Sequence, residues 1–118
     1  MRIEDLVEDA HLFEMSNFKK NETGLPVNIY VSSGSGLDYK LPRIKAMVDF
    51  GDKMNIRNTI SIILKKDFTE DDIVGYHRLP SSVVNQLRKY INLNYEVLID
   101  YWNDEISTTE LTQRLQKI

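Results

Sequence analysis

The most constraining feature of the sequence is a change in the spacing of its apolar residues near residue 80. Between residues 27 and 79, apolar side chains recur mostly at every second position, as in Val27, Ile29 and Val31. That period places alternate side chains on opposite faces of a β-strand. Over residues 81–118 the period becomes that of amphipathic helices. This order predicts an α+β fold, with C-terminal helices packed on one face of an antiparallel sheet of three to four strands.

The length of 118 residues predicts a single α+β domain, large enough to close a hydrophobic core. Residues 1–20 are expected to hold an N-terminal helix at about 3–11 and a connection, residues 27–79 the sheet, and residues 81–118 a helical layer. Turn residues over 16–26 predict a connection there as well. The predicted strands are 27–31, 43–48, 59–64 and a weaker fourth at 73–79, where Gly75 interrupts the pattern.

Helical periodicity after Pro80 predicts a helix that opens at Ser81. Asn92 and Asn94 indicate a break, so residues 94–103 form either a second helix or a bent continuation. Trp102 shares an apolar stripe with its neighbours and is expected in the core, whereas Tyr101 is expected to point elsewhere and to be available for contacts.

The last helix is predicted to begin at Ser107, where Ser107 and Glu110 have the spacing of a capping box. Ile106 and Leu111 stand where a hydrophobic staple would join the residue before the cap to the first turns of the helix. Leu111, Leu115 and Ile118 are spaced to form one buried stripe of that helix.

The composition excludes several chemistries. The chain has no cysteine, which removes disulfides, thiol nucleophiles and Cys-based metal sites. No apolar run approaches the roughly 18 residues of a membrane span, and the acidic first residues do not resemble a signal peptide, so a cytoplasmic location without membrane contact is expected. The loop of residues 32–36 lacks the Gly-Lys-Ser/Thr continuation of a phosphate-binding loop.

The candidates for catalysis are few. His11 and His77 are the only histidines, and neither has the spacing of a metal site. Asp71 and Asp72 lie close enough in sequence to orient His77, which leaves a hydrolase as one alternative. We nevertheless predict no catalytic, metal-ligating or cofactor-binding residue, and therefore no enzyme activity and no cofactor.

The charge is unevenly distributed along the chain. The formal net charge is −3, yet residues 40–66 hold seven basic and two acidic residues. Clustered Lys and Arg bear on binding partners rather than on the fold. If the first three strands pair antiparallel, the sheet face away from the helices carries a polar, basic set: Asn28, Tyr30, Ser32, Arg43, Lys45, Met47, Arg57, Thr59 and Ser61.

This face has three interpretations. It is a solvated surface, a nucleic-acid surface on which cations meet phosphates and Tyr30 stacks on a base, or a protein-binding surface. The predicted partner-binding residues are Tyr30, Arg43, Lys45, Met47 and Arg57. An exposed edge strand, with Met47 and Ile63 on the same face, would also allow a homodimer.

Three stretches carry a family resemblance: TGLPVNIYVSS, then LPRIKAMV, then NYEVLIDYW before a short terminal helix. From Asn21 to Ile118 the chain resembles small phage, prophage and bacterial hypothetical proteins with a TGLP opening, a PRIK-like strand and a closing L-x-x-x-W segment. It is also distantly similar to a bacterial domain of unknown function found beside toxin–antitoxin-type genes, whose His-rich strand is replaced here by Pro42, Arg43, Ile44 and Lys45.

The resemblance implies a mobile-element context and an α+β domain without an established activity. Small phage proteins of this kind often act stoichiometrically, by binding and blocking a host factor, and the resemblance implies the same for this chain. The sequence thus leads to the hypothesis of a non-enzymatic binding protein, such as a stoichiometric inhibitor of a bacterial immune component. The alternative is a nucleic-acid-binding regulator that uses the same basic face.

Overall fold

A computed structural model of the chain describes residues 15–34 and 41–118. Five strands form one antiparallel sheet in the order β1-β2-β3-β4-β5. They are β1 (Met15–Phe18), β2 (Ile29–Ser32), β3 (Arg43–Met47), β4 (Thr59–Ile63) and β5 (Ile73–Val74). The helices are α2 (Lys20–Thr23), α3 (Ser81–Trp102) and α4 (Thr108–Arg114), and a 3-10 turn, η1 (Glu70–Asp72), precedes β5. The helix expected at 3–11 lies outside the described residues.

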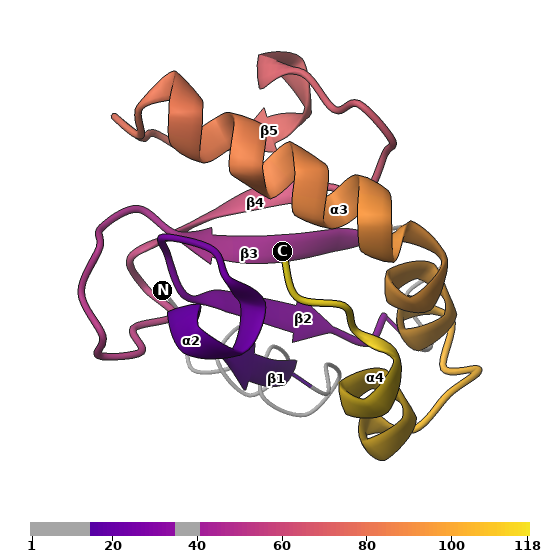
Figure 1. Ribbon diagram of the computed structural model, residues 1–118. Helices are drawn as coiled ribbons and strands as arrows, with labels where there is room; N and C mark the ends of the chain where they lie inside the picture. The colour runs from indigo at the N-terminus through magenta and orange to yellow at the C-terminus, as the bar shows by residue number, and fades with distance from the viewer. Residues whose placement is uncertain (1–14, 35–40) are drawn as a thin grey trace, which may run out of the picture.

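The long helix α3 crosses one side of the sheet, and the C-terminal segment runs back over β2 and β3 on the same side (Figure 1). The strand alternation decides what this side buries, because every second side chain points toward α3. Two cross-strand rows lie under the helix, each with residues at most 1% exposed: Ile29, Ala46 and Ile60, then Val31, Ile44 and Ile62. From α3, the stripe of Leu87, Ile91 and Leu98 completes the core at 0% exposure.

The α+β class is confirmed, but the sheet has five strands rather than three to four. The additional strand β1 lies in the segment predicted as a connection. It has four residues and one buried side chain, Phe18, which is too few to show an alternation of apolar and polar residues. The predicted fourth strand at 73–79 is reduced to the two residues of β5. Gly75 has a φ of +119°, a conformation that ends the regular strand.

No separate helix begins near Asn92 and Asn94. Of the two expected alternatives the structure shows the second, because α3 is one helix of 22 residues whose C-terminal part bends away (Figure 1). Both asparagines bond to segments outside the helix, and Asn94 also donates to a carbonyl one turn back within α3. Asn92 donates from Nδ2 to the Asp67 carboxylate at 2.8 Å and accepts from the Asp67 N–H at 2.8 Å. Asn92 thereby fastens the loop after β4 to α3.

Asn94 holds the C-terminal segment in the same way and is 2% exposed. Its Oδ1 accepts from the Gln116 N–H at 2.7 Å, and its Nδ2 donates to the Gln116 carbonyl at 2.9 Å and to the Tyr90 carbonyl at 3.1 Å. The Ile118 N–H then donates to the Thr23 carbonyl at 2.9 Å. The segment is thus fastened to both α3 and α2.

The last helix begins as predicted, because the Glu110 N–H donates to Ser107 Oγ at 3.1 Å and Leu111 is fully buried. It ends at Arg114, so the prediction of one helical stripe reaching Ile118 is wrong. Leu115 and Ile118 still pack against the core, but from an extended segment.

The two aromatic residues at the end of α3 are both buried. Trp102 is 4% exposed, which confirms its place in the core. The prediction for Tyr101 is wrong, because it is 1% exposed. Its hydroxyl lies 3.0 Å from Thr108 Oγ1 and 3.4 Å from Ser16 Oγ, so β1 and α4 cover a side of α3 that the helical period alone leaves open.

Replacing Gly34 with alanine should destabilise the protein by about 1–3 kcal/mol. A Cβ at Gly34 would lie 2.1 Å from Trp102 Cε2, and the Gly34 N–H donates to the Trp102 carbonyl at 2.9 Å. The matched control is Gly51→Ala in an exposed loop, where the nearest atom to the added Cβ is Asp49 Oδ1 at 3.1 Å. Urea unfolding measures both variants, and equal stabilities of Gly34→Ala and wild type would contradict this packing.

Replacing Asn94 with alanine should lower the free energy of unfolding by about 2–3 kcal/mol, because buried backbone groups of Tyr90 and Gln116 lose their partner. The Gln116 amide should also exchange faster with deuterium. Gln86→Ala, at an exposed position of the same helix, is the control and should cost less than about 0.5 kcal/mol. Unchanged exchange at Gln116 in the Asn94 variant would show that the hydrogen bonds of Asn94 do not hold the C-terminal segment in place.

Candidate functional site

The side of the sheet opposite α3 is called the outer face here. One cross-strand row spans all five strands: Asn17, Tyr30, Lys45, Ser61 and Val74. Two shorter rows flank it, Arg43 beside Ile63 and Met47 beside Thr59. Among the described elements, α3, α4 and the C-terminal segment all pack on the other side (Figure 1). None of these elements covers the outer face, which makes it the candidate binding surface.

Two cations occupy the middle of the outer face. Arg43 and Lys45 lie on β3, the central strand, and point to the same side at a spacing of about 7 Å along the strand. Both are half-buried, which leaves their charged ends at the surface. Arg43 donates from Nε to the Leu41 carbonyl at 3.0 Å. Within residues 15–34 and 41–118, neither cation has an acidic partner within ion-pair distance.

Tyr30 lies directly opposite Lys45 on the neighbouring strand β2. Its ring is half-buried, and burial raises the pKa of its phenol. The hydroxyl therefore remains protonated around neutral pH and can donate a hydrogen bond. Tyr30, Arg43 and Lys45 together form a compact cationic and aromatic patch, which is named the cationic patch below.

The other two predicted partner-binding residues lie differently. Met47 was predicted to lie on the surface, but it is 1% exposed and therefore cannot contact a partner directly. Arg57 is exposed but belongs to the loop before β4, which begins at Thr59. Asn28, expected on the outer face, is fully buried because its side chain bonds to the Lys20 N–H and to the Gly51 and Asp52 carbonyls.

The outer face also has an apolar side. Ile63 stands directly opposite Arg43, and Val74 on β5 is 56% exposed in the same row as Lys45. The β4 alternation placed Ile63 on this face from sequence, whereas Val74 was missed. Its strand is two residues long, so no alternation was present to assign its side chain.

His77 is engaged by its own loop. Its Nε2 lies 3.2 Å from Glu70 Oε2, and its Nδ1 accepts from the Leu79 N–H at 3.1 Å. The carboxylate beside the ring is thus Glu70 and not Asp71 or Asp72. Both ring nitrogens hold the η1–β5 region to the start of α3, which favours a structural role. His11 lies outside the described residues.

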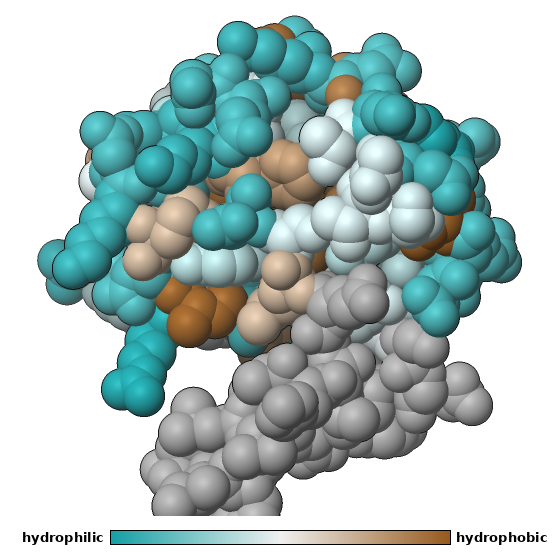
Figure 2. Space-filling view, turned by 90° about the horizontal axis from the view of Figure 1, so that it is seen from below, coloured by the Kyte–Doolittle hydropathy of each residue, from teal (hydrophilic) through white to brown (hydrophobic). Residues whose placement is uncertain are grey.

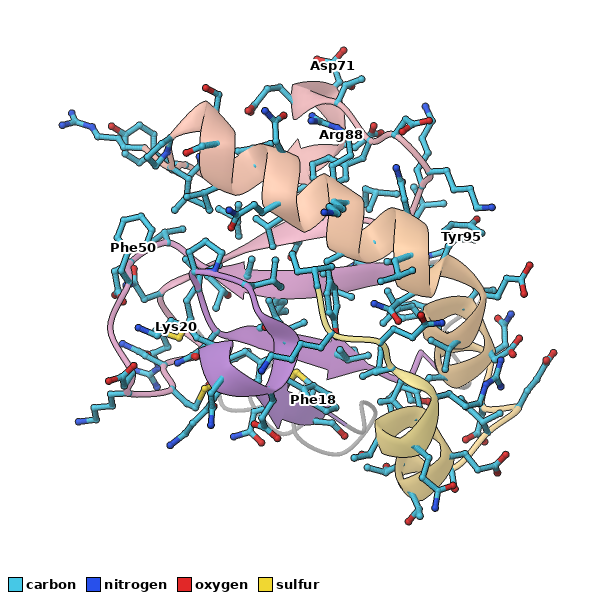
Figure 3. All side chains as sticks on the ribbon, in the orientation of Figure 1. Phe18, Lys20, Phe50, Asp71, Arg88 and Tyr95 are labelled. Atoms are coloured by element: carbon cyan, nitrogen blue, oxygen red, sulfur yellow. The ribbon has the colours of Figure 1, made fainter. Side chains whose placement is uncertain are left out.

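A hollow of about 310 Å³ lies beside α3, away from the outer face. Its cations are already engaged, since Lys66 stands 5.6 Å from the centre of the Tyr95 ring and Arg114 Nη2 lies 3.2 Å from Asp100 Oδ2. Tyr95 and the side chains around it are visible in Figure 3. Cations held by internal partners attract an external anion less than those of the cationic patch.

The rest of the described chain offers neither a metal site nor a membrane-spanning helix. Seen from the β1 side, the rim of the described surface is hydrophilic, and hydrophobic and weakly polar residues lie nearer its middle (Figure 2). In residues 15–34 and 41–118, no group of three acidic, histidine or cysteine side chains is arranged to hold a metal ion. None of the described helices is long and apolar enough to cross a membrane.

The loop between β3 and β4 is fastened by Lys20, which lies near Phe50 in Figure 3. Lys20 Nζ is 2.8 Å from Asp52 Oδ1 and also donates to the Phe50 carbonyl. The hydrogen bond from Lys20 to the Asp52 carboxylate, together with the positive charge of Lys20, lowers the pKa of Asp52. The loop that carries Arg57 is thereby attached to α2.

Replacing Lys20 with methionine should raise the pKa of Asp52 toward its usual value, as read from carboxyl chemical shifts in an NMR titration. Because the folded-state pKa lies below the unfolded one, the pair stabilises the fold above the unfolded pKa, and this contribution is lost as the pH falls through the folded pKa. On acidification, wild type should therefore lose more stability than Lys20→Met. Lys65→Met is the control, because Lys65 is exposed and does not act on Asp52. Identical titrations of Asp52 in wild type and Lys20→Met would contradict the contact.

No protein-family model matches the sequence, and no curated protein and no solved structure matches it significantly. Function therefore has to be inferred from the residues and geometry of the chain itself.

Proposed function

We propose that this protein is a non-enzymatic binding protein that engages a partner protein through the outer face of its sheet. One observation carries the proposal: Arg43 and Lys45 stand at the centre of a sheet face that no described helix covers, without an acidic partner in the described ranges. Cations in such a place attract an acidic surface and orient it as it approaches.

The residue types of the cationic patch support a protein partner. Tyrosine and arginine are the side chains that most often dominate the energy of protein interfaces. Both lie on regular strands, which hold them in place before a partner arrives and so reduce the entropy lost on binding. Given the resemblance to proteins of mobile elements, the proposal extends to the stoichiometric inhibition of a bacterial immune component.

The pairing of Tyr30 with Lys45 favours a second candidate, a nucleic-acid-binding regulator. A ring beside a cation suits a stacked base and its phosphate. The outer face nevertheless carries one aromatic residue within its three rows, whereas sheets that bind single-stranded RNA stack two or three bases on several rings. We therefore favour the protein partner.

The double charge reversal Arg43→Glu with Lys45→Glu should abolish capture of a stoichiometric protein partner by the tagged protein from bacterial lysate. Each like-charge contact with an acidic partner would then oppose binding. The control reverses Lys89 on α3 and Lys117 in the C-terminal segment, two exposed cations on the side of the sheet opposite the outer face, and changes the net charge equally. Both double variants should keep the melting temperature of wild type to within about 4 °C, since these cations lie at the surface.

Retained capture by the outer-face variant would refute the proposed surface. Fluorescence anisotropy with single-stranded RNA, single-stranded DNA and duplex DNA tests the second candidate. Phosphate contacts would make the affinity fall steeply with salt. Tight, salt-sensitive binding that the outer-face variant loses would replace the protein partner with a nucleic acid.

A further inference from the structure

The outer face has two chemically different halves. The cationic patch covers β2 and β3, and the aliphatic side chains of Ile63 and Val74 lie on β4 and β5. Val74 is 56% exposed, although it is a large apolar residue on an edge strand. An aliphatic group left in water beside cations is a source of binding energy for a partner that covers both.

Strand geometry fixes how far apart the two halves are. Ile63 is the direct cross-strand neighbour of Arg43, which places their Cβ atoms about 5 Å apart. Val74 is two strands away from Lys45 in the same row, at about 10 Å, and only the small side chain of Ser61 lies between them. A single short segment of a partner can therefore reach a cation and an aliphatic side chain together.

The geometry points to a partner segment that carries carboxylates next to aliphatic side chains, with the carboxylates over Arg43 and Lys45 and the aliphatic group over Ile63 and Val74. This inference rests on the proposed function and specifies its partner: an acidic, aliphatic-containing protein segment. A polyanion without apolar groups would satisfy only half of the face. The phosphate backbone of a nucleic acid gains nothing from Val74, because it offers no aliphatic surface.

Two synthetic peptides distinguish the contribution of the cationic half of the outer face from that of its aliphatic half. One twelve-residue peptide repeats Glu-Glu-Leu-Leu and the other repeats Glu-Glu-Ser-Ser, both labelled with fluorescein and titrated with the full chain. We expect the leucine peptide to bind at least about tenfold more tightly, since burying one aliphatic side chain is worth about this factor. Oligothymidylate of twelve nucleotides, as a polyanion without aliphatic side chains, should bind more weakly than the leucine peptide.

Val74→Ser should weaken the leucine peptide about threefold to tenfold and leave the serine peptide unchanged, so that the two affinities converge. Leu93→Ser is the matched control, because Leu93 is also an aliphatic residue with 45% exposure but lies on α3. It should change neither affinity. Both positions are exposed, so both variants should fold, and urea unfolding verifies this.

Equal affinities of the two peptides for wild type, or no effect of Val74→Ser, would overturn the inference. Tighter binding of oligothymidylate than of the leucine peptide would overturn it as well. These failures are distinguishable from failure of the proposed function. If the Arg43 and Lys45 reversals still abolish partner capture, the cationic surface stands and only the aliphatic half is wrong. If they do not, both proposals fall.

Discussion

The packing of one long helix against one face of the sheet is the interaction on which the remaining structure depends. Leu87, Ile91 and Leu98 of α3 are fully buried against the inward rows of β2, β3 and β4, and the exclusion of this apolar surface from water is the main source of stability. In residues 15–34 and 41–118, α3 and α4 lie on one side of the sheet. The strands that present isoleucine and valine to α3 must present every other side chain to the opposite side. The packing that forms the core therefore also creates the outer face.

Side-chain amides supply the second level of organisation, two of them buried and one half-buried. Asn28, Asn92 and Asn94 each hold backbone or side-chain groups of a distant segment: the β3–β4 loop, the loop after β4 and the C-terminal segment. An amide side chain both donates and accepts, so one asparagine can hold the N–H and the carbonyl of an irregular segment that has no ladder partner. Such segments need partners of this kind because buried backbone groups left without hydrogen bonds are costly.

These amides also explain where sequence reasoning reached its limit. Period-two and period-3.6 patterns predicted β2, β3, β4 and the start of α3, and the Ser107 capping box predicted the start of α4, because each depends on residues close in sequence. The role of an asparagine depends on what lies across the fold. Asn94 resembles a helix breaker and Asn28 resembles a surface residue until their distant partners are known. Strands β1 and β5 have four and two residues and take their register from β2 and β4, so little local pattern was present. For the candidate site, alternation placed Tyr30, Arg43 and Lys45 on one face, whereas the burial of Met47 required the whole structure.

For the proposed binding of an acidic partner, the location of the cations on β3 matters more than the net charge of −3. A protein of this charge repels an acidic partner at long range, but salt screens that repulsion beyond about 8–10 Å. At contact, the local arrangement of Arg43 and Lys45 decides the interaction, and the central strand holds both in fixed positions. Because neither side chain contributes to the core rows, their charge can be reversed without disturbing the packing against α3. In the proposed function, binding and stability are thus carried by opposite faces of the same strands, so mutations on the two faces should affect them separately.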